Sequence, residues 1–296
     1  MTDGFAVVDK APGMTSHDVV ARARRRFGTR KVGHAGTLDP DATGVLILGI
    51  GRATRLLQFL TGMDKSYDAE IQFGVETSTL DAAGEVTATH DMGPLDPDEV
   101  AAAAATFLGD IEQIPPMVSA IKIDGRRLHE LAREGKEVDR PPRPVRVDRF
   151  DVEPVDLVAG RWRARIDCSS GTYVRTLAAD LGTALGGGAH VHSLRRTAVG
   201  PFTLEQAAPL DEVTIRPPAE GLSHMPQVAV PSDVATSVRY GRVLRPIELG
   251  VHGDGPWVVL DDEGEVLAVY RPHKDTLVKP VMVLASAPGE SRAPGS

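Results

Sequence analysis

A thirteen-residue stretch near the N-terminus places one carboxylate, Asp39, between glycine-bearing segments and directly before a proline. Residues 33–45 read Gly-His-Ala-Gly-Thr-Leu-Asp-Pro-Asp-Ala-Thr-Gly-Val. Pro40 lacks an N–H and disfavours a helical conformation at Asp39, while the glycines permit backbone shapes that other residues resist. The apolar run that follows, residues 45–50, predicts a buried strand. An isolated Asp-Pro pair is usually a structural turn, but a polar loop that ends in a core strand can also hold a reactive carboxylate rigidly.

The whole stretch resembles the signature loop of bacterial tRNA pseudouridine-55 synthases, the B family of pseudouridine synthases. Four further segments match this family in the expected order, and with the loop they cover about residues 5 to 205. They are DKAPGMTS (9–16), KSY (65–67), CSSGTYVRTL (168–177) and AHVHSLRR (189–196). One local departure is Lys10-Ala11-Pro12-Gly13, where many relatives have proline directly after the lysine.

The resemblance implies roles for particular residues. It makes Asp39 the catalytic residue and Arg175 its partner, because a guanidinium can bind a carboxylate through two hydrogen bonds and lower its pKa. The ring of Tyr67 offers a face on which a flipped uracil could stack. The resemblance adds a part for the Tyr67 hydroxyl in the final removal of the proton from C5, and it implies that His34 supports the flipped-out state of the RNA. The residues expected to bind the substrate are His34, Tyr67, Tyr173, Arg175 and Leu194. From the residues alone, Tyr67, Tyr173 and Leu194 would more often be ordinary core.

The implied reaction detaches uracil from the sugar at N1, rotates it and reattaches it through C5. This change requires no oxidant and no energy donor, so we expect no cofactor, and the sequence has no Walker or dinucleotide fingerprint. His190 and His192 would share one face of a strand, but no third ligand follows at metal-binding spacing, so we expect no metal. Whether Asp39 attacks C6, attacks C1′ or takes a proton from C2′ stays open.

Two other classes of protein fit part of the pattern. Residues 39–43 formally match the Asp-x-Asp-x-Thr motif of aspartyl phosphotransferases, but here the apolar strand follows the motif instead of preceding it. A non-catalytic tRNA-binding or tRNA-folding protein would use the same basic residues without chemistry. The presence of Asp39, Tyr67 and Arg175 together favours an enzyme.

The distribution of charge is compatible with an RNA partner although the formal net charge is −8. Residues 66–121 contain eleven acidic residues and no lysine or arginine, so the remainder of the chain is net positive. Between residues 20 and 60, eight basic residues stand against Asp39 and Asp41. Such a basic segment around the loop can bind phosphates. The expected partner is the TΨC stem-loop of tRNA.

Composition indicates a cytoplasmic protein. No apolar run approaches the ~18 residues of a membrane span, and the N-terminus lacks the features of a secretory signal. Cys168 is the single cysteine, which excludes an internal disulfide, and we expect it to be buried instead of reactive. Nothing in the sequence implies a protein partner, so we expect a monomer.

The pattern of elements predicts an α+β fold with a mixed or antiparallel sheet. Alternation over residues 67–75 predicts a half-buried strand, and residues 144–153 and 162–168 predict an antiparallel pair. A possible capping box at Thr15 and Asp18 predicts a helix that stops at Gly28.

Proline clustering near residues 217–231 predicts a domain boundary. We expect a catalytic domain over residues 1–220, a linker over 221–230, a small β-rich module over 231–285 and a disordered tail over 286–296. The resemblance implies that the module is of the PUA kind, an RNA-binding fold.

Overall fold

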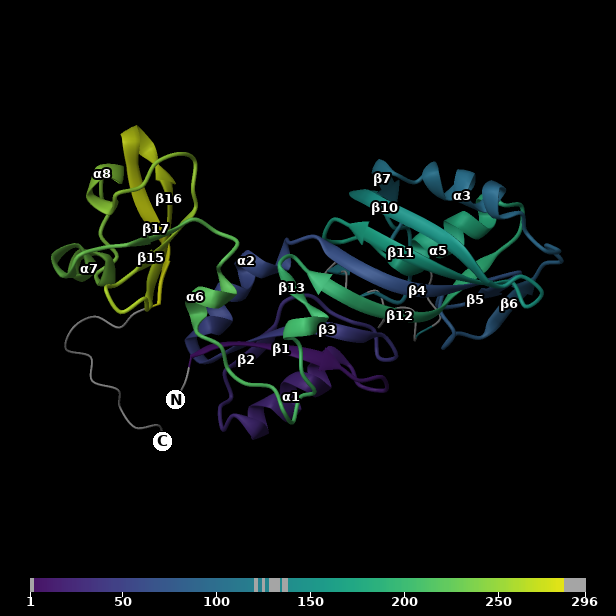
Figure 1. Cartoon of the computed structure of the whole chain (residues 1–296), viewed down its shortest axis with the longest axis horizontal. Helices are drawn as coiled ribbons and strands as arrows, with labels where there is room; N and C mark the ends of the chain where they lie inside the picture. The colour runs from purple at the N-terminus through teal and green to yellow at the C-terminus, as the bar shows by residue number, and fades with distance from the viewer. Residues whose placement is uncertain (1–2, 120–121, 124–125, 128–133, 135–137, 285–296) are drawn as a thin grey trace.

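The computed structural model describes residues 3–119, 122–123, 126–127, 134 and 138–284, so the expected disorder of residues 286–296 lies outside the described residues. Among the described residues, nine strands form one large sheet (Figure 1). Its main path runs β1 (Gly4–Lys10), β3 (Thr43–Ile50), β12 (Ala189–Val199), β4 (Lys65–Phe73), β11 (Arg161–Cys168), β10 (Arg143–Asp156) and β7 (Gly109–Gln113). Strand β2 (Val32–His34) pairs with β3, and β13 (Phe202–Thr203) pairs with β12.

Helices and small sheets surround this large sheet. The helices are α1 (Ser16–Arg26), α2 (Gln58–Thr61), α3 (Pro97–Ala105), α5 (Val174–Ala184) and α6 (Pro218–Gly221). The short strand pairs are β5 (Val75–Thr77) with β6 (Val86–Thr89), and β8 (Lys122–Ile123) with β9 (Arg126–Arg127). Most pairs in the large sheet are antiparallel, while β12 and β3 run parallel. The expectation of an α+β fold with a mixed sheet is confirmed.

A second, smaller sheet forms the C-terminal module. It contains β14 (Gln227–Ala229), β15 (Trp257–Leu260), β16 (Val266–His273) and β17 (Leu277–Val283), with α7 (Ser232–Arg239) and α8 (Pro246–Leu249) beside it. One core is internal to this module and includes Val238, Leu267 and Tyr270. A second core is shared, because Val258 and Met282 of the module belong to the same buried cluster as residues of β1 and β3.

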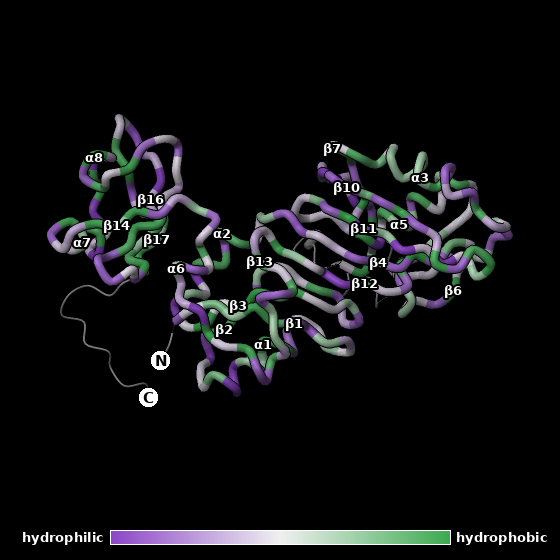
Figure 2. Tube along the Cα trace, viewed as in Figure 1, coloured by the Kyte–Doolittle hydropathy of each residue, from purple (hydrophilic) through white to green (hydrophobic). Residues whose placement is uncertain are grey.

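The alternation expected in β4 is present and decides which side chains reach the interior. Lys65, Tyr67, Ala69, Ile71 and Phe73 are buried, and the residues between them are more exposed. Hydrophobic and hydrophilic residues alternate along β4 and β11 in Figure 2, as half-buried strands require.

The expected capping box at the start of α1 is also present. The Asp18 amide donates to the Thr15 hydroxyl at 3.1 Å, and the Thr15 amide donates to the Asp18 carboxylate at 2.9 Å. Val19 and Ala23 are buried on the inner face of the helix, which ends before Gly28, a residue with φ of +61°. This places α1 against β2 at the end of the large sheet where the loop after β2 begins (Figure 1).

Gly44 shows why this loop requires glycine where it enters β3. A Cβ atom at this position would lie 2.1 Å from the Arg196 carbonyl oxygen of β12, and the φ of Gly44 is +101°. We expect Gly44→Ala to lower the free energy of unfolding by about 3 kcal/mol, since it combines backbone strain with a steric clash. Urea denaturation measures this. Gly62→Ala is the control, because no atom lies within 4 Å of a Cβ there, and it should be nearly neutral.

Within the described part of the chain, no helix is both long and apolar enough to cross a membrane.

Candidate active site

Asp39 lies in the loop between β2 and β3, and a fully buried arginine fixes the backbone of this loop. Arg196 of β12 is 1% exposed. Its Nε donates to the Val45 carbonyl at 2.8 Å, and its terminal nitrogens donate to the carbonyls of Thr37 and Gly36, each at 3.2 Å. A buried guanidinium needs such acceptors for its donors, so the position of Arg196 and the path of the loop depend on each other.

The other side of the loop is held by residues at the start of the chain. Lys10 is 1% exposed, and its ammonium donates to the carbonyls of Pro40 at 2.8 Å and Met14 at 2.7 Å. Burial lowers the pKa of Lys10. The Leu38 amide donates to the Ser16 hydroxyl at 2.9 Å, which in turn donates to the Leu38 carbonyl at 3.2 Å. Both neighbours of Asp39 in the chain are therefore anchored.

Arg175 and Asp39 form a two-pronged ion pair. Arg175 Nε lies 3.0 Å from Asp39 Oδ2, and a terminal nitrogen donates to Oδ1 at 3.2 Å. Arg175 also donates to the carbonyls of Thr79 and Val118, each at 2.9 Å, and lies 3.3 Å from Asp81 Oδ2. The Arg175 side chain is 5% exposed, whereas that of Asp39 is 39% exposed. The arginine is thus a fixed support, and the carboxylate remains accessible.

The pKa of Asp39 departs from its ordinary value in the direction opposite to the one expected from Arg175 alone. Burial of the carboxyl raises its pKa, and this outweighs the lowering by Arg175; the nearby carboxylate of Asp81 raises it further. The expectation that Arg175 would depress the pKa of Asp39 is therefore wrong in its net direction. The charge of Arg175 could be read from the sequence, but neither the burial of Asp39 nor the proximity of Asp81 could.

A cavity of about 270 Å³ opens beside Asp39. Its lining includes five of the six residues expected to act on the substrate, namely Asp39, Tyr67, Tyr173, Arg175 and Leu194. These residues come from the loop after β2, from β4, from the start of α5 and from β12. The fold therefore gathers residues from widely separated segments at one enclosed surface.

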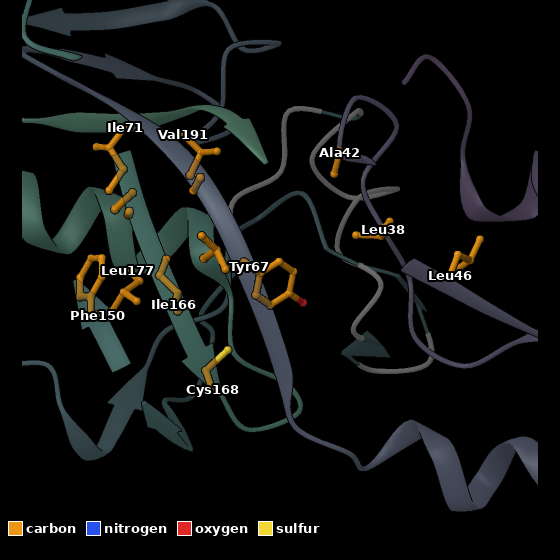
Figure 3. Close-up of a cluster of buried hydrophobic side chains, with 14 of the residues drawn as sticks. Leu38, Ala42, Leu46, Tyr67, Ile71, Phe150, Ile166, Cys168, Leu177 and Val191 are labelled. Atoms are coloured by element: carbon orange, nitrogen blue, oxygen red, sulfur yellow. The ribbon is translucent and has the colours of Figure 1, made fainter. Parts of the chain in front are cut away.

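Tyr67 contributes an aromatic side chain to this cavity. Figure 3 shows it projecting from β4 towards the loop that carries Leu38 and Ala42, and all three belong to one buried cluster. Burial raises its pKa, and the nearby Arg196 guanidinium acts in the opposite direction. The hydroxyl is therefore protonated near neutral pH. Cys168 lies close by and is buried, as expected, and that burial raises the pKa of its thiol to about 11.

Tyr173 and Leu194 complete the cavity from α5 and β12. Tyr173 is the N-terminal cap residue of α5, and the Gln113 side chain binds its backbone, accepting from the amide at 2.9 Å and donating to the carbonyl at 3.2 Å. Leu194 lies on β12 opposite Ala69. Leu194 also lines a second, more apolar cavity of about 390 Å³, which shares Asp39 and Arg175 with the first.

His34 does not line the 270 Å³ cavity. It ends β2, five residues before Asp39, and its ring packs edge to face on His17 with the centroids 5.4 Å apart. Burial lowers the pKa of His34, and the neighbouring His17 lowers it further. The imidazole is therefore neutral at physiological pH.

The sequence reasoning assigned no role to three residues at this site: Asp81, Lys65 and Arg196. Lys65 and Arg196 fall inside segments used for the resemblance, and their burial as cations could not be read from the sequence. Asp81 follows Leu80, whose φ is +61°, in a turn after β5. No pattern around Asp81 pointed to the site, because its contact with Arg175 joins positions 94 residues apart.

The fold is similar to two solved structures. One is a chain in the crystal structure of a Cbf5–Nop10–Gar1 complex, with a TM-score of 0.72 and 24% identity, covering 96% of this chain and 85% of that chain. The other is a chain in an H/ACA RNP bound to a substrate RNA containing 2′-deoxyuridine, with a TM-score of 0.71 and 22% identity, covering 95% and 85%. At this level of identity, the likeness shows the fold.

Two family profiles match the sequence. The profile of the TruB family pseudouridylate synthase N-terminal domain matches residues 24–174, and that of the tRNA pseudouridylate synthase B C-terminal domain matches residues 175–251. The fold and the sequence thus define a pseudouridylate synthase. The chain belongs to the TruB family, and the resemblance seen in the sequence is confirmed.

Curated relatives are similar over nearly their whole length. A protein of Rhodococcus jostii named tRNA pseudouridine synthase B is 49% identical over 282 residues, covering 90% of each chain. A protein of the same name from Corynebacterium glutamicum is 48% identical over 289 residues, covering 93% of this chain and 97% of the relative.

Proposed function

We propose that the protein converts uridine 55 in the TΨC loop of tRNA to pseudouridine, with Asp39 as its catalytic residue. One observation carries this proposal: an accessible carboxylate lines a cavity and is held by a buried arginine through a hydrogen bond to Oδ1 and an ion contact to Oδ2. The names of relatives 46–49% identical to this chain support tRNA as the substrate. Family membership argues against an aspartyl phosphotransferase.

The geometry supports a separate role for each residue around the cavity. Arg175 orients Asp39, while Tyr67 offers a ring on which a flipped uracil can stack, an interaction worth about 1–3 kcal/mol. Tyr173 and Leu194 close the walls around the base and exclude water. His34, which lies outside this cavity, is neutral and can occupy space that the base leaves in the RNA loop. The reaction is an isomerisation and uses no cofactor.

Release of tritium tests the activity and separates it from RNA binding alone. A tRNA transcript labelled with tritium at C5 of its uridines should release label with this protein, in the absence of magnesium and of a phosphoryl donor. A transcript with cytidine at position 55 should release none. Tight binding of both transcripts without release of label would instead support the non-catalytic RNA-folding alternative.

A basic surface beside the loop supplies candidate phosphate contacts. Arg22 and Arg25 on α1, and Arg30 and Lys31 in the turn before β2, are exposed. Other basic residues of this segment have internal partners; Arg52, for example, binds Asp3 and the Leu284 carbonyl. We therefore assign tRNA contact to the exposed four.

The double variant Arg30→Ala, Lys31→Ala is expected to weaken tRNA binding and to reduce the slope of log affinity against log salt. Each lost phosphate contact changes that slope by roughly 0.7–0.9. Filter binding over a range of salt concentrations measures the effect. Arg163→Ala is the matched control, since this exposed arginine lies on β11 and pairs with Glu153 at 3.4 Å. An unchanged slope in the double variant would remove these residues from the interface.

The proposal also covers the domains of the chain, its oligomeric state and its location in the cell. Residues 1–220 form the catalytic domain and 231–285 an RNA-binding module of the PUA kind, and the connection over 221–230 contributes β14 to the sheet of that module. We expect the protein to act as a monomer. The free Cys168 fits the reducing cytoplasm. Light scattering on the purified protein, free and with tRNA, tests the monomer.

A further inference from the structure

Three cationic side chains line the cavity beside Asp39: Lys65, Arg175 and Arg196. Arg175 uses each of its three guanidinium nitrogens on carboxylates or carbonyls of the protein. Arg196 likewise places each of its nitrogens on a backbone carbonyl. Both arginines are therefore committed to holding the protein around the cavity.

Lys65 differs from the two arginines. Its ammonium donates to the carbonyls of Thr61 at 3.2 Å and Met63 at 2.5 Å. An ammonium has three N–H donors, so these bonds leave one for the cavity that Lys65 lines. Lys65 is 8% exposed and lies on the same face of β4 as Tyr67, two residues along the strand.

The loop between β2 and β3, which carries Asp39, passes directly over Lys65. A Cβ atom at Gly36 would lie 3.7 Å from Lys65 Cε and 3.8 Å from a terminal nitrogen of Arg196. The lysine side chain is therefore enclosed between β4 and the loop that carries Asp39. A cation in such a place is desolvated, and its interaction with charge inside the cavity is stronger than it would be in water.

We propose that Lys65 is a further catalytic residue, whose ammonium donates its third N–H to a carbonyl oxygen of the detached uracil and stabilises the negative charge on that base. The proposal rests on the function proposed above. When the C1′–N1 bond breaks, its electron pair leaves with the base, and the charge spreads over N1, O2 and O4. A positioned cation at one of these oxygens stabilises the state in which this charge develops.

The remaining steps balance without a further reactant. The detached base forms the new bond from C5 to C1′ with its own electrons. C5 then loses its proton, N1 gains one, and the product is the neutral isomer. Lys65 keeps its proton throughout, so its part is electrostatic.

The groups around Lys65 place its titration in the mildly alkaline range, while burial also lowers the pKa of Lys10 on the other side of the loop. Burial and the charge of Arg196 lower its pKa to about 8, whereas Cys168 and Asp64 act in the opposite direction. The thiol of Cys168 has a pKa of about 11, and burial raises the pKa of Tyr67 above its ordinary value of 10.0. Lys65 is thus charged at neutral pH and loses its charge as the pH rises past about 8.

Two variants separate charge from shape. Lys65→Gln keeps a donor for the neighbouring carbonyls but is neutral, and we expect its single-turnover rate on tRNA to fall about 10²-fold. Lys65→Arg keeps the charge and should retain more of the rate, with any alkaline decline of the wild-type rate moved to higher pH. A decline at the same pH in both proteins would belong to another group, such as Lys10 or the substrate, and would count against Lys65.

The acidity of the leaving base provides the decisive test. A tRNA with 5-fluorouridine at the target position releases a base that carries negative charge more readily, so it depends less on Lys65. At about pH 6, where Lys65 is charged, the ratio of the wild-type rate to the Lys65→Gln rate should be at least about tenfold smaller with 5-fluorouridine than with uridine. Fluorine at C5 prevents the final loss of a proton from that atom, so the isomerised base keeps its fluorine on C5 and takes up water across C6 and N1. Tandem mass spectrometry of the digested tRNA detects either product, because a C-glycoside keeps its base on fragmentation.

Equal ratios for the two substrates would overturn the proposal and reduce Lys65 to a support for the Thr61 and Met63 carbonyls. If Lys65→Gln does not fold, the same ratio measured with Lys65→Met decides the question. Failure of the proposed function is distinguishable, since the wild-type protein would then convert neither substrate.

Discussion

Replacement of Asp39 by asparagine is expected to lower the rate of isomerisation by about 10³-fold or more while leaving tRNA affinity nearly unchanged. The amide has almost the same size as the carboxyl group, so the loop anchored by Lys10 and Arg196 should keep its shape. It lacks the charge and the nucleophilicity that any of the three chemical routes requires. Single-turnover tritium release measures the rate, and filter binding measures the affinity.

The pH dependence of the wild-type rate is a second test of the role of Asp39. Because burial raises the pKa of Asp39, the reactive ionised form is lost at a higher pH than for an aspartate in water. The single-turnover rate should therefore fall as the pH is lowered through this raised pKa. Substantial activity in Asp39→Asn would contradict the assignment whatever the pH profile.

Arg175→Ala is expected to have the second-largest effect, on both rate and stability. It leaves Asp39 and Asp81 without their shared cation and the carbonyls of Thr79 and Val118 without their donor. We expect a loss of about 3 kcal/mol in the free energy of unfolding and at least about a 10²-fold lower single-turnover rate. Loss of the cation also raises the pKa of Asp39 further, so the acid decline in rate should move to higher pH.

Two further variants serve as comparisons for Arg175→Ala. Arg175→Lys retains a charge but not the two-pronged geometry, and it should remain clearly slower than the wild-type protein. Arg163→Ala removes an exposed arginine from a surface ion pair, which should change the free energy of unfolding by less than about 1 kcal/mol. Near-normal rates in both Arg175 variants would remove this residue from the catalytic site.

Much of the fold could be predicted from local sequence patterns. The strand over residues 45–50, the alternation through Tyr67 and the capping box at Thr15 are all present, because each depends on neighbours a few positions away. The order of strands in the sheet could not be obtained in this way. For example, the parallel pairing of Arg195 with Thr43 joins segments 152 positions apart, and no local pattern encodes it.

The resemblance indicated which residues to expect near Asp39, but the sequence did not reveal their burial or their pKa values. The family resemblance supplied Asp39, Tyr67, Tyr173, Arg175 and Leu194, and the structure places them around one cavity. His34 lies outside that cavity, since β2 carries it towards His17. The raised pKa of Asp39 and the burial of Lys65 depend on the exclusion of water by distant segments. Such effects arise only when the chain is folded.

The long-range contacts of the first sixty residues have a consequence for synthesis. In β1, the backbone of Phe5 exchanges two hydrogen bonds with the backbone of Arg216. Arg52 donates to the carbonyl of Leu284, 232 positions later. Contacts so distant in sequence close slowly and cannot form until both segments have been made. A nascent chain on the ribosome that lacks β12 therefore displays Asp39 without Arg196 beneath its loop. The Asp39 carboxylate therefore reaches its final surroundings only after Arg196, 157 positions later, has been made.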